Sequence, residues 1–371
     1  MFRRFTCGGN KWKMLLLCGI MLAALSGCGS RQTAELDFVR EMGAGWNLGN
    51  SLESVCADGS YTGNELELYW QNPATTKDMI DEIQKAGFGT IRIPVTWENH
   101  MDSQGSMEAA WLDRVREVVD YAIEDGMYVI LDAHHDTWFE PLPEKEESAV
   151  SMMKNVWNQI GEAFIGYDNH LLFEGMNEPR CIGTVEEWTG GSEETAELVN
   201  RLNQTFVDTI RAQGGNNRER YLLVTTYGGS SLENALEYFK MPEGEHLIAT
   251  VHAYLPYSFA MDISGETVWQ ETGVQEIEDT MSRLHTKFIS EGIPVIIGEF
   301  GAIDKCNTEE RIQWLTAYLE AVDKNGISCI WWDEGGPSGE TYGRFRIFDR
   351  EQRSWLFPEI RDLLTEKEEV S

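Results

Sequence analysis

Short apolar runs alternate with longer amphipathic stretches from about residue 37 to residue 366. The apolar runs are nearly continuous, which is typical of strands buried on both faces. They predict strands at Gly43–Leu48, Thr90–Pro94, Tyr128–Ala133, Leu171–Gly175, Tyr221–Thr225, Leu247–His252, Val295–Gly298 and Ser328–Trp332. Apolar residues at helical spacing between them predict helices such as Thr76–Ala86, Ala110–Glu124, Val156–Phe164, Ala196–Ala212, Val274–Ser290 and Thr308–Lys324. Strands that each lead into a helix in this way predict a closed parallel (β/α)8 TIM barrel, folded as a single domain.

Glycine ends several of the predicted helices just before the next strand begins. Gly87, Gly126, Gly292 and Gly326 stand at these positions, where glycine supplies the left-handed C-terminal cap. The alternative architecture is an open doubly wound sheet. No Gly-x-Gly-x-x-Gly follows an early predicted strand and no phosphate-binding loop is found in the sequence. The closed barrel is therefore favoured.

The first 28 residues indicate export rather than a globular fold. Basic residues precede the apolar run Met14–Leu25, which is too short to span a bilayer as a mature helix. The run ends in Leu25-Ser26-Gly27-Cys28, which resembles the cleavage box of bacterial lipoproteins. We predict a signal peptide at residues 1–27, a lipidated Cys28 with a tether over residues 28–36, and one folded domain over residues 37–371. The alternative is an ordinary secretory signal with an incidental cysteine.

The charge of the chain narrows its possible partners. The formal net charge is −32, and it becomes −36 (−32 − 4) without residues 1–27, which carry four basic and no acidic residues. Nucleic acids and anionic membrane surfaces reward clustered Lys and Arg, so both are excluded as ligands. Contact with a membrane is expected only through the lipid anchor. We expect a monomer, carried as a secreted, cell-surface or outer-membrane lipoprotein of a bacterium.

Four cysteines remain in the predicted domain, namely Cys56, Cys181, Cys306 and Cys329. They could pair in three ways, but their spacings match neither a disulfide framework nor a zinc site. Isolated buried thiols are favoured for most of them.

Polar side chains stand at the carboxyl ends of most predicted strands, where a parallel barrel builds its active site. These include Asn47, Asn50, Glu53, Arg92, His134, His135, Asn177, Glu178, His252, Tyr254, Glu299 and Trp332. Glu178 and Glu299 each follow a short apolar strand, and a carboxylate buried there without partners would cost several kcal/mol. A pair of carboxylates at the barrel mouth is what glycoside hydrolysis needs.

Five strand-end motifs, in order along the chain, resemble glycoside hydrolase family 5 (cellulase family A). They are Gly45-Trp46-Asn47-Leu48-Gly49-Asn50, Ile91-Arg92-Ile93-Pro94-Val95-Thr96-Trp97, Phe173-Glu174-Gly175-Met176-Asn177-Glu178-Pro179, Val251-His252-Ala253-Tyr254 and Ile297-Gly298-Glu299-Phe300-Gly301. They are most similar to the family's bacterial endo-β-1,4-glucanases of broad specificity. The resemblance implies a retaining enzyme that needs no cofactor. Its expected partners are β-1,4-linked glucan polysaccharides, namely cellulose, mixed-linkage β-glucan and xyloglucan, which it would hydrolyse. A dedicated xyloglucanase or β-mannanase, and a non-catalytic surface glycan-binding lipoprotein, are the alternatives.

The resemblance implies a role for each matching residue. Glu178 matches the general acid/base, and it is expected to be neutral at rest because burial and the charge of Glu299 raise its pKa. Glu299 matches the nucleophile, with the two carboxyl groups about 5–5.5 Å apart. Asn177 matches the residue that hydrogen-bonds the 2-hydroxyl of the cleaved sugar. Arg92 is expected to pair with Glu299 and hold it ionised.

His252 and Tyr254 are two positions apart, so on a strand their side chains point the same way. Tyr254 matches the phenol that bonds the nucleophile, and His252 matches the imidazole near the acid/base. The adjacent His134 and His135 suggest a metal site, but neighbours on a strand face opposite sides and no third ligand has zinc-like spacing. No metal is therefore predicted. His134 matches the histidine of the family's third strand, and His135 is expected in the sugar-binding wall.

Trp332 matches the aromatic platform beneath the cleaved sugar, whereas its neighbour Trp331 is expected in the core. Asn50 and Glu53 follow the first strand in the pattern Gly-Asn-x-x-Glu, with which relatives bind hydroxyls of outer glucosyl units. Capping of the loop is the alternative for Glu53.

Overall fold

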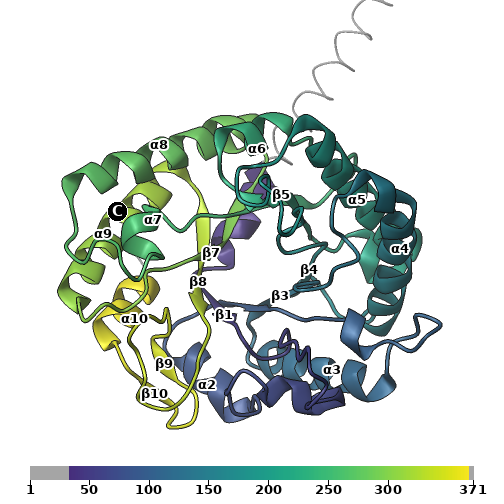
Figure 1. Cartoon of the computed structure of the whole chain (residues 1–371), viewed down its shortest axis with the longest axis horizontal. Coiled ribbons are helices and arrows are strands. Elements are labelled where there is room, and N and C mark those ends of the chain that lie inside the picture. Colours follow the sequence, from purple (N-terminus) through teal and green to yellow (C-terminus); the bar gives the residue numbers. More distant parts are fainter. Residues whose placement is uncertain (1–32, 367–371) are drawn as a thin grey trace, which may run out of the picture.

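The computed structural model describes residues 33–366 (Figure 1). The predicted signal peptide and the lipidation site Cys28 lie outside the described residues. Within residues 33–366, no helix is both long enough and apolar enough to cross a membrane.

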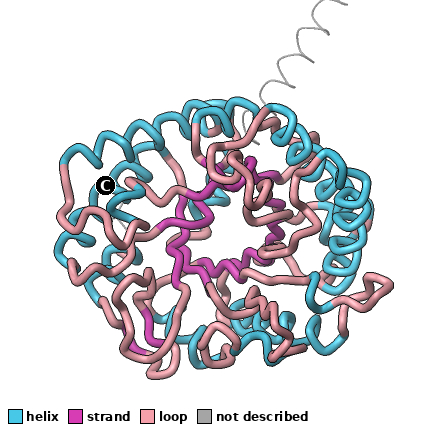
Figure 2. Tube along the Cα trace, viewed as in Figure 1, coloured by secondary structure: helices cyan, strands magenta, loops and turns pink. Residues whose placement is uncertain are grey.

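Parallel strands close into a barrel in chain order, with β1 hydrogen-bonded to both β2 and β8. The strands are β1 (Gly45–Leu48), β2 (Thr90–Ile93), β3 (Tyr128–Asp132), β4 (Leu171–Glu174), β5 (Leu222–Ser230), β6 (Leu247–His252), β7 (Val295–Phe300) and β8 (Ser328–Asp333). Figure 2 shows them as a ring inside a shell of helices. The predicted (β/α)8 barrel is confirmed. The largest strand error is at β5, which continues past the predicted end at Thr225 through Gly228 and Gly229.

The surrounding helices are α2 (Lys77–Lys85), α3 (Ala109–Glu124), α4 (Glu146–Ala163), α5 (Glu193–Ala212), α6 (Glu233–Tyr238), α7 (Tyr257–Ala260), α8 (Glu271–Lys287), α9 (Thr308–Asn325) and α10 (Pro358–Thr365). A two-stranded antiparallel sheet, β9 (Phe348–Asp349) with β10 (Ser354–Trp355), follows β8. The predicted helix over Val156–Phe164 begins ten residues too late. Met153 and Ala149, one and two turns before Trp157, are already buried in the core. Polar residues between them make the helical pattern weaker in the sequence.

The barrel interior has an apolar lower layer and a charged upper layer. The lower layer contains Ile130, Leu172, Leu223, Ile248, Ile296 and Ile330. Successive side chains on a strand alternate between faces, so Asp132 and Glu174, two positions beyond Ile130 and Leu172, also point inward. The apolar layer therefore ends directly below the charged layer that contains Asp132 and Glu174.

A helical stretch over residues 33–41 covers this lower layer. Phe38, Val39 and Met42 pack into it, and the Phe38 ring stacks on Tyr221 with centroids 3.7 Å apart. The backbone N–H of His246 also donates to the Glu35 carboxylate, at 3.4 Å. The folded domain thus already includes residues 33–36, which were predicted to be tether.

A register shift at the end of β7 aims one of the predicted carboxylates into the barrel mouth. Val251 of β6 pairs with Ile297, but the next residue, His252, pairs with Glu299 and skips Gly298. A Cβ on Gly298 would lie 2.9 Å from the Thr250 hydroxyl, so only glycine fits there without displacement. Bulges of this kind re-aim side chains beside active sites.

The four cysteines of the described chain, Cys56, Cys181, Cys306 and Cys329, are free thiols. Cys181 is buried, but Cys306 is exposed and the other two are partly exposed. The expectation that most of these thiols are buried is therefore wrong. None of these thiols lies in the charged layer of the barrel.

Candidate active site

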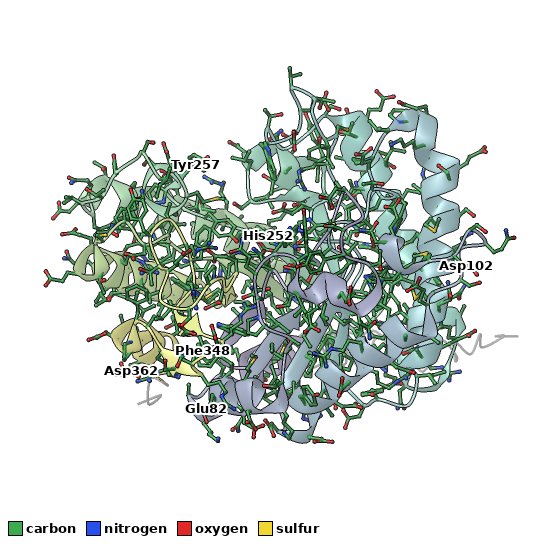
Figure 3. All side chains as sticks on the ribbon, turned by 60° about the horizontal axis from the view of Figure 1, so that its bottom comes forward. Glu82, Asp102, His252, Tyr257, Phe348 and Asp362 are labelled. Atoms are coloured by element: carbon green, nitrogen blue, oxygen red, sulfur yellow. The ribbon has the colours of Figure 1, made fainter. Side chains whose placement is uncertain are left out.

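A cleft of about 1230 Å³ opens at the carboxyl ends of the strands. Most of the predicted site residues line it, namely Asn50, His134, His135, Asn177, Glu178, His252, Tyr254, Glu299 and Trp332. Figure 3 shows His252 near the middle of the molecule and Tyr257, another lining residue, near its edge. Arg92 is fully buried beneath the cleft. Most of the residues predicted for the site therefore lie together on one cleft.

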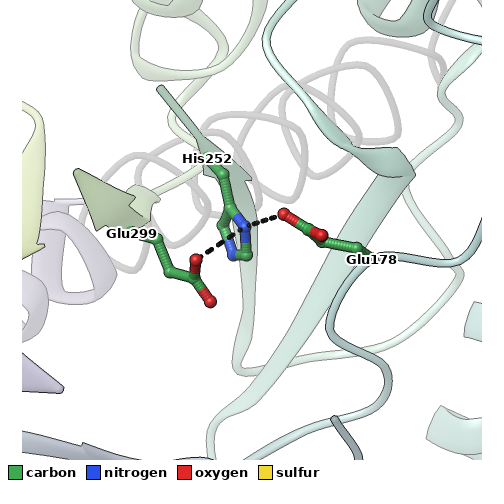
Figure 4. A group of neighbouring side chains, drawn as sticks. All are labelled: Glu178, His252 and Glu299. Carbon is green, nitrogen blue, oxygen red and sulfur yellow. Dashed lines mark hydrogen bonds and ion pairs between the residues drawn. The ribbon is translucent and has the colours of Figure 1, made fainter. Parts of the chain in front are cut away.

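The two predicted catalytic carboxylates meet across one imidazole (Figure 4). Nδ1 of His252 lies 2.7 Å from Oε1 of Glu178 and 3.5 Å from Oε2 of Glu299. An oxygen of Glu178 and one of Glu299 lie within 4.8 Å of each other. Glu178 follows β4 and Glu299 lies within β7, so the barrel brings together residues that are 121 positions apart (299 − 178).

The guanidinium of Arg92 supports the site from below. Its Nη1 donates to Oε1 of Glu299 at 2.9 Å and to Oδ1 of Asn47 at 3.1 Å. Its Nε and Nη2 donate to the two oxygens of Glu174, at 2.6 and 3.1 Å. Nη2 also donates to Oδ1 of Asn177, at 2.8 Å. The predicted pairing of Arg92 with Glu299 is confirmed, and the same side chain orients the amide of Asn177.

Asp132 and Glu174 are site residues that the sequence analysis missed. Oδ2 of Asp132 lies 2.7 Å from Nη2 of Arg92 and 2.7 Å from Nδ1 of His134. Burial raises the pKa of Asp132, against the charge of Arg92, to about 6. Asp132 stands two positions before His134, on the same strand face. That spacing is the sequence signal that could have found it.

Tyr254 contacts Glu299 as predicted. Its hydroxyl donates to Oε2 of Glu299 at 2.9 Å, while Arg92 takes the other oxygen. Burial and the charge of Glu299 raise the pKa of Tyr254 well above its ordinary value, so the phenol remains a donor. Two donors on two oxygens hold the carboxylate in one orientation.

The pKa of Glu178 shifts in the direction opposite to the one expected from burial and the charge of Glu299. Burial raises the pKa of Glu178, but the hydrogen bond and charge of His252 and the charge of Arg180 outweigh burial and lower it. Burial lowers the pKa of His252, yet the charge of Glu299 and the hydrogen bond to Glu178 outweigh burial and raise it. The two opposite shifts therefore draw the proton that the pair shares towards the imidazole.

The prediction that Glu53 binds sugar hydroxyls is also wrong. Its side chain is fully buried, and its carboxylate accepts from the backbone N–H of Ser51 at 2.8 Å and from that of Asn50. Burial raises the pKa of Glu53 to about 8. Asn50, which does line the cleft, has a φ of 57°, a conformation rare outside glycine. Glu53 therefore caps the loop that presents Asn50, which was its predicted alternative role.

Aromatic rings form much of the cleft wall. Trp332 lines the cleft and stacks on His134 with ring centroids 5.8 Å apart and an interplanar angle of 8°. Its neighbour Trp331 is fully buried, as predicted. Trp70 and Trp188 also line the cleft and were not predicted. Neither stands at a strand end, so only their residue type could have suggested them.

The rings of His134 and His135 lie 4.5 Å apart and nearly perpendicular. Within residues 33–366, the metal-type donor atoms that gather most closely are those of Glu178, His252 and Glu299 instead. The hydrogen bond between His252 and Glu178 accounts for that proximity. His134 and His135 do not form a site of their own with a third ligand in the described chain.

Comparison with known proteins places the chain in a family. The profile of the family described as cellulase (glycosyl hydrolase family 5) matches residues 52–338. Endoglucanase A of Clostridium longisporum is 44% identical over 337 residues, which are 88% of this chain and 65% of that protein. Endoglucanase A of Ruminococcus albus is 41% identical over 346 residues, with 91% of this chain and 93% of that protein covered.

Solved structures agree. A GH5-4 broad specificity endoglucanase from Clostridium longisporum superposes with a TM-score of 0.85 at 42% identity, covering 89% of this chain and 97% of that one. A xyloglucan-specific endo-β-1,4-glucanase from a metagenomic library, solved with cellotriose, superposes with a TM-score of 0.86 at 36% identity, covering 90% and 99%. A match over most of the chain, at this identity and with this superposition, shows the family. The chain belongs to glycosyl hydrolase family 5.

Proposed function

We propose that the chain is a retaining endo-β-1,4-glucanase with Glu299 as nucleophile and Glu178 as acid/base. One observation carries the proposal: an oxygen of each carboxylate lies within 4.8 Å of the other. Retaining enzymes hold their carboxyl groups about 5–5.5 Å apart, whereas inverting enzymes need about 6.5–9.5 Å to admit a water. The endoglucanase names of the relatives and the cellotriose bound in structural neighbours support a β-1,4-glucan as the substrate.

The geometry supports a two-step reaction. First, an oxygen of Glu299 attacks the anomeric carbon, the glycosidic bond breaks, and Glu178 gives a proton to the leaving oxygen. That proton is the one shared with His252 across the 2.7 Å hydrogen bond. Second, a water attacks the same carbon, Glu178 takes the proton from the water, and the bond to Glu299 breaks. Arg92 and Tyr254 hold the Glu299 carboxylate in one orientation for the first attack.

The stereochemical outcome tests this mechanism. Cellopentaose hydrolysis followed by proton NMR should show the β-anomer of the product before mutarotation. Appearance of the α-anomer first would overturn the retaining assignment. Absence of reducing-sugar release from any β-glucan would instead favour the non-catalytic surface glycan-binding lipoprotein.

A second candidate function is hydrolysis of substituted glucans such as xyloglucan. The cleft volume of about 1230 Å³ exceeds the roughly 300–1,000 Å³ of ordinary ligand pockets, and a structural neighbour is described as xyloglucan-specific. Rates on carboxymethylcellulose, barley β-glucan, xyloglucan, glucomannan and xylan separate the possibilities. Preference for glucomannan would point to the β-mannanase alternative.

We also propose that the chain needs no metal and is anchored through Cys28. EDTA should leave hydrolysis of soluble β-glucan unchanged, and loss of turnover restored by one added divalent ion would revive the metal alternative. The Leu-Ser-Gly-Cys box motivates the anchor. Cys28→Ala should keep activity but release the protein from the membrane fraction or leave it uncleaved. Normal lipid labelling of that variant would contradict the anchor.

A further inference from the structure

Arg180 lies beside the carboxylate of Glu178, on the loop between β4 and α5. Its Nη1 donates to Oε2 of Glu178 at 3.3 Å and to the backbone carbonyl of Glu178 at 3.1 Å. The other carboxylate oxygen, Oε1, accepts from His252. The two oxygens of Glu178 therefore have separate partners, and Arg180 is one of them.

The same guanidinium packs against an exposed tryptophan. Cζ of Arg180 lies 4.2 Å from the ring centroid of Trp188, and its Nε donates to Glu187 at 3.4 Å. Trp188 is 60% exposed and lines the cleft, whereas Arg180 does not line it. Arg180 thus takes one face of the ring. The exposed remainder of Trp188, which lines the cleft, can receive the apolar face of a sugar.

The barrel order places Trp188 on the side of the leaving group. Trp188 lies on the loop after β4, and Trp332 lies at the end of β8. In a closed ring of these strands in chain order, β4 and β8 are opposite each other. Glu178, which protonates the leaving oxygen, also follows β4. The sugar that departs is therefore expected on the Trp188 side, and the sugar that is attacked on the Trp332 side.

We infer that Arg180 is a positioning residue that links the acid/base carboxylate of Glu178 to a leaving-group sugar platform formed by Trp188. The inference rests on the proposed glucanase function and names a further determinant of it. Arg180 holds one oxygen of Glu178 and one side of the Trp188 ring at the same time. Loss of either contact would let two groups move: the Glu178 carboxyl group that donates the proton, and the leaving-group sugar whose oxygen receives it.

The charge of Arg180 also affects the pH up to which Glu178 and His252 keep their shared proton. Glu178 and His252 share that proton, and the other charged or titratable groups near Glu178 are Glu299, His135 and Tyr254. A neighbouring cation disfavours a bound proton. Removing the charge of Arg180 should therefore let the pair hold its proton to a higher pH. The alkaline limb of the pH profile of kcat/KM reports this proton.

Three variants test the inference on two substrates. Cellopentaose occupies both sides of the cleavage point, whereas 2,4-dinitrophenyl β-cellobioside places no sugar on the leaving side and needs little protonation. Arg180→Gln should lose about tenfold in kcat/KM on cellopentaose and under about threefold on the aryl substrate. It should also move the alkaline limb of kcat/KM on cellopentaose to higher pH by about one unit. That is the low end of the pKa shift that a neighbouring opposite charge causes in a carboxyl group.

The other variants separate charge from stacking. Arg180→Lys keeps the charge, so the alkaline limb of kcat/KM should stay near its wild-type position. The variant should still lose activity on cellopentaose, because Lys lacks the planar guanidinium that contacts both Glu178 and Trp188. Trp188→Ala should lose activity on cellopentaose without moving the limb. Arg353→Gln removes an equal charge from an exposed pair with Asp78 and serves as the control. Melting temperatures of all variants report folding.

Equal losses on both substrates with an unmoved limb would show that Arg180 only supports the loop, and would overturn the inference. An Arg180→Lys variant that matches wild type on cellopentaose would also overturn it. If wild type cleaves neither substrate, the proposed function itself fails. The two failures are therefore distinguishable.

Discussion

His252 donates from Nδ1 to Oε1 of Glu178 at 2.7 Å, and this hydrogen bond joins the two groups into one titrating unit (Figure 4). The pKa of His252 is raised by its carboxylate partners and that of Glu178 is lowered by its cationic ones. These shifts draw the shared proton towards the imidazole. The reaction needs it on the carboxyl group, which lies one hydrogen bond away. Coupled groups of this kind titrate as a pair rather than singly.

The pair predicts the position of the alkaline limb. Because His252 holds the last proton with a raised pKa, the limb of wild-type kcat/KM should lie above pH 6.5, about the ordinary value for histidine. In His252→Gln only the Glu178 carboxyl is left to hold the proton, so the limb should move to lower pH. Rates on cellopentaose from pH 4 to pH 9 measure this. A limb that stays in place would show that His252 does not store the proton.

Tyr254→Phe should slow the reaction without unfolding the barrel. The variant loses only the 2.9 Å hydrogen bond to Oε2 of Glu299. Hydrogen bonds to charged groups contribute about 1.5–3 kcal/mol, so kcat/KM should fall by about 10- to 150-fold. Tyr342→Phe, at a 63% exposed position, is the matched control and should behave as wild type. A fall of less than about threefold for Tyr254→Phe would mean that Arg92 alone orients the nucleophile.

Glu174→Ala should lower the free energy of unfolding. Glu174 pairs with Arg92 where both side chains are fully buried, and removing one partner of a buried pair costs about 3–5 kcal/mol. Urea unfolding measures this. Glu174→Gln keeps an acceptor oxygen for Arg92 and should lose less. Asp78→Asn, which breaks the exposed pair with Arg353, should cost no more than about 1 kcal/mol, and an equal cost for Glu174→Ala would contradict the argument.

Sequence periodicity was sufficient for the barrel because each strand is short, apolar and closed by a polar end. It also predicted that Glu178, Glu299 and Arg92 lie at one end of the barrel, because each stands near the carboxyl end of a strand. It could not place Glu53, because a residue five positions past the end of a strand can turn towards the cleft or into its own loop. The backbone N–H groups of Asn50 and Ser51 decide that choice, and no sequence pattern records their direction.

The direction of the pKa shift of Glu178 was mispredicted for a related reason. Burial and the charge of Glu299 were foreseen, and both raise a carboxyl pKa. The opposing contacts depend on a 2.7 Å approach by His252 and a 3.3 Å approach by Arg180. Arg180 stands two positions past Glu178 in the sequence, but its loop had no predicted shape. Distances of this kind arise only from the tertiary fold.

His100 should make the protein sensitive to acid. It is buried and stacks on Trp111 with ring centroids 3.6 Å apart, and burial lowers its pKa from 6.5 to about 4. The unfolded chain binds this proton below about pH 6.5 and the folded chain only near pH 4, so stability is lost as pH falls through that window. His100→Phe keeps an aromatic ring without titrating. It should reduce the loss of unfolding free energy between pH 7 and pH 5 by about 2 kcal/mol, which corresponds to the 1.5 pH units between 6.5 and 5. Parallel curves of unfolding free energy against pH for the variant and wild type would contradict this.

The two carboxylates should fail in different ways. If Glu299 is the nucleophile, no covalent intermediate forms in Glu299→Ala and turnover should be nearly lost on every substrate. If Glu178 is the acid/base, Glu178→Ala removes only the proton donor and base. On an aryl cellobioside with a good leaving group the first step needs little protonation, so a burst of phenol should precede slow hydrolysis of the trapped intermediate. Stopped-flow absorbance measures the burst.

Azide then identifies which carboxylate plays which role. In Glu178→Ala, azide should attack the covalent intermediate from the face that water normally uses, accelerate the slow step and give the β-glycosyl azide. In Glu299→Ala, azide can only take the place of the missing nucleophile, so any rescue should give the α-glycosyl azide. The proximity of both carboxylates to His252, at 2.7 and 3.5 Å, means that distance alone does not separate their roles. Opposite stereochemistry in the two variants would reverse the assignment of Glu178 and Glu299.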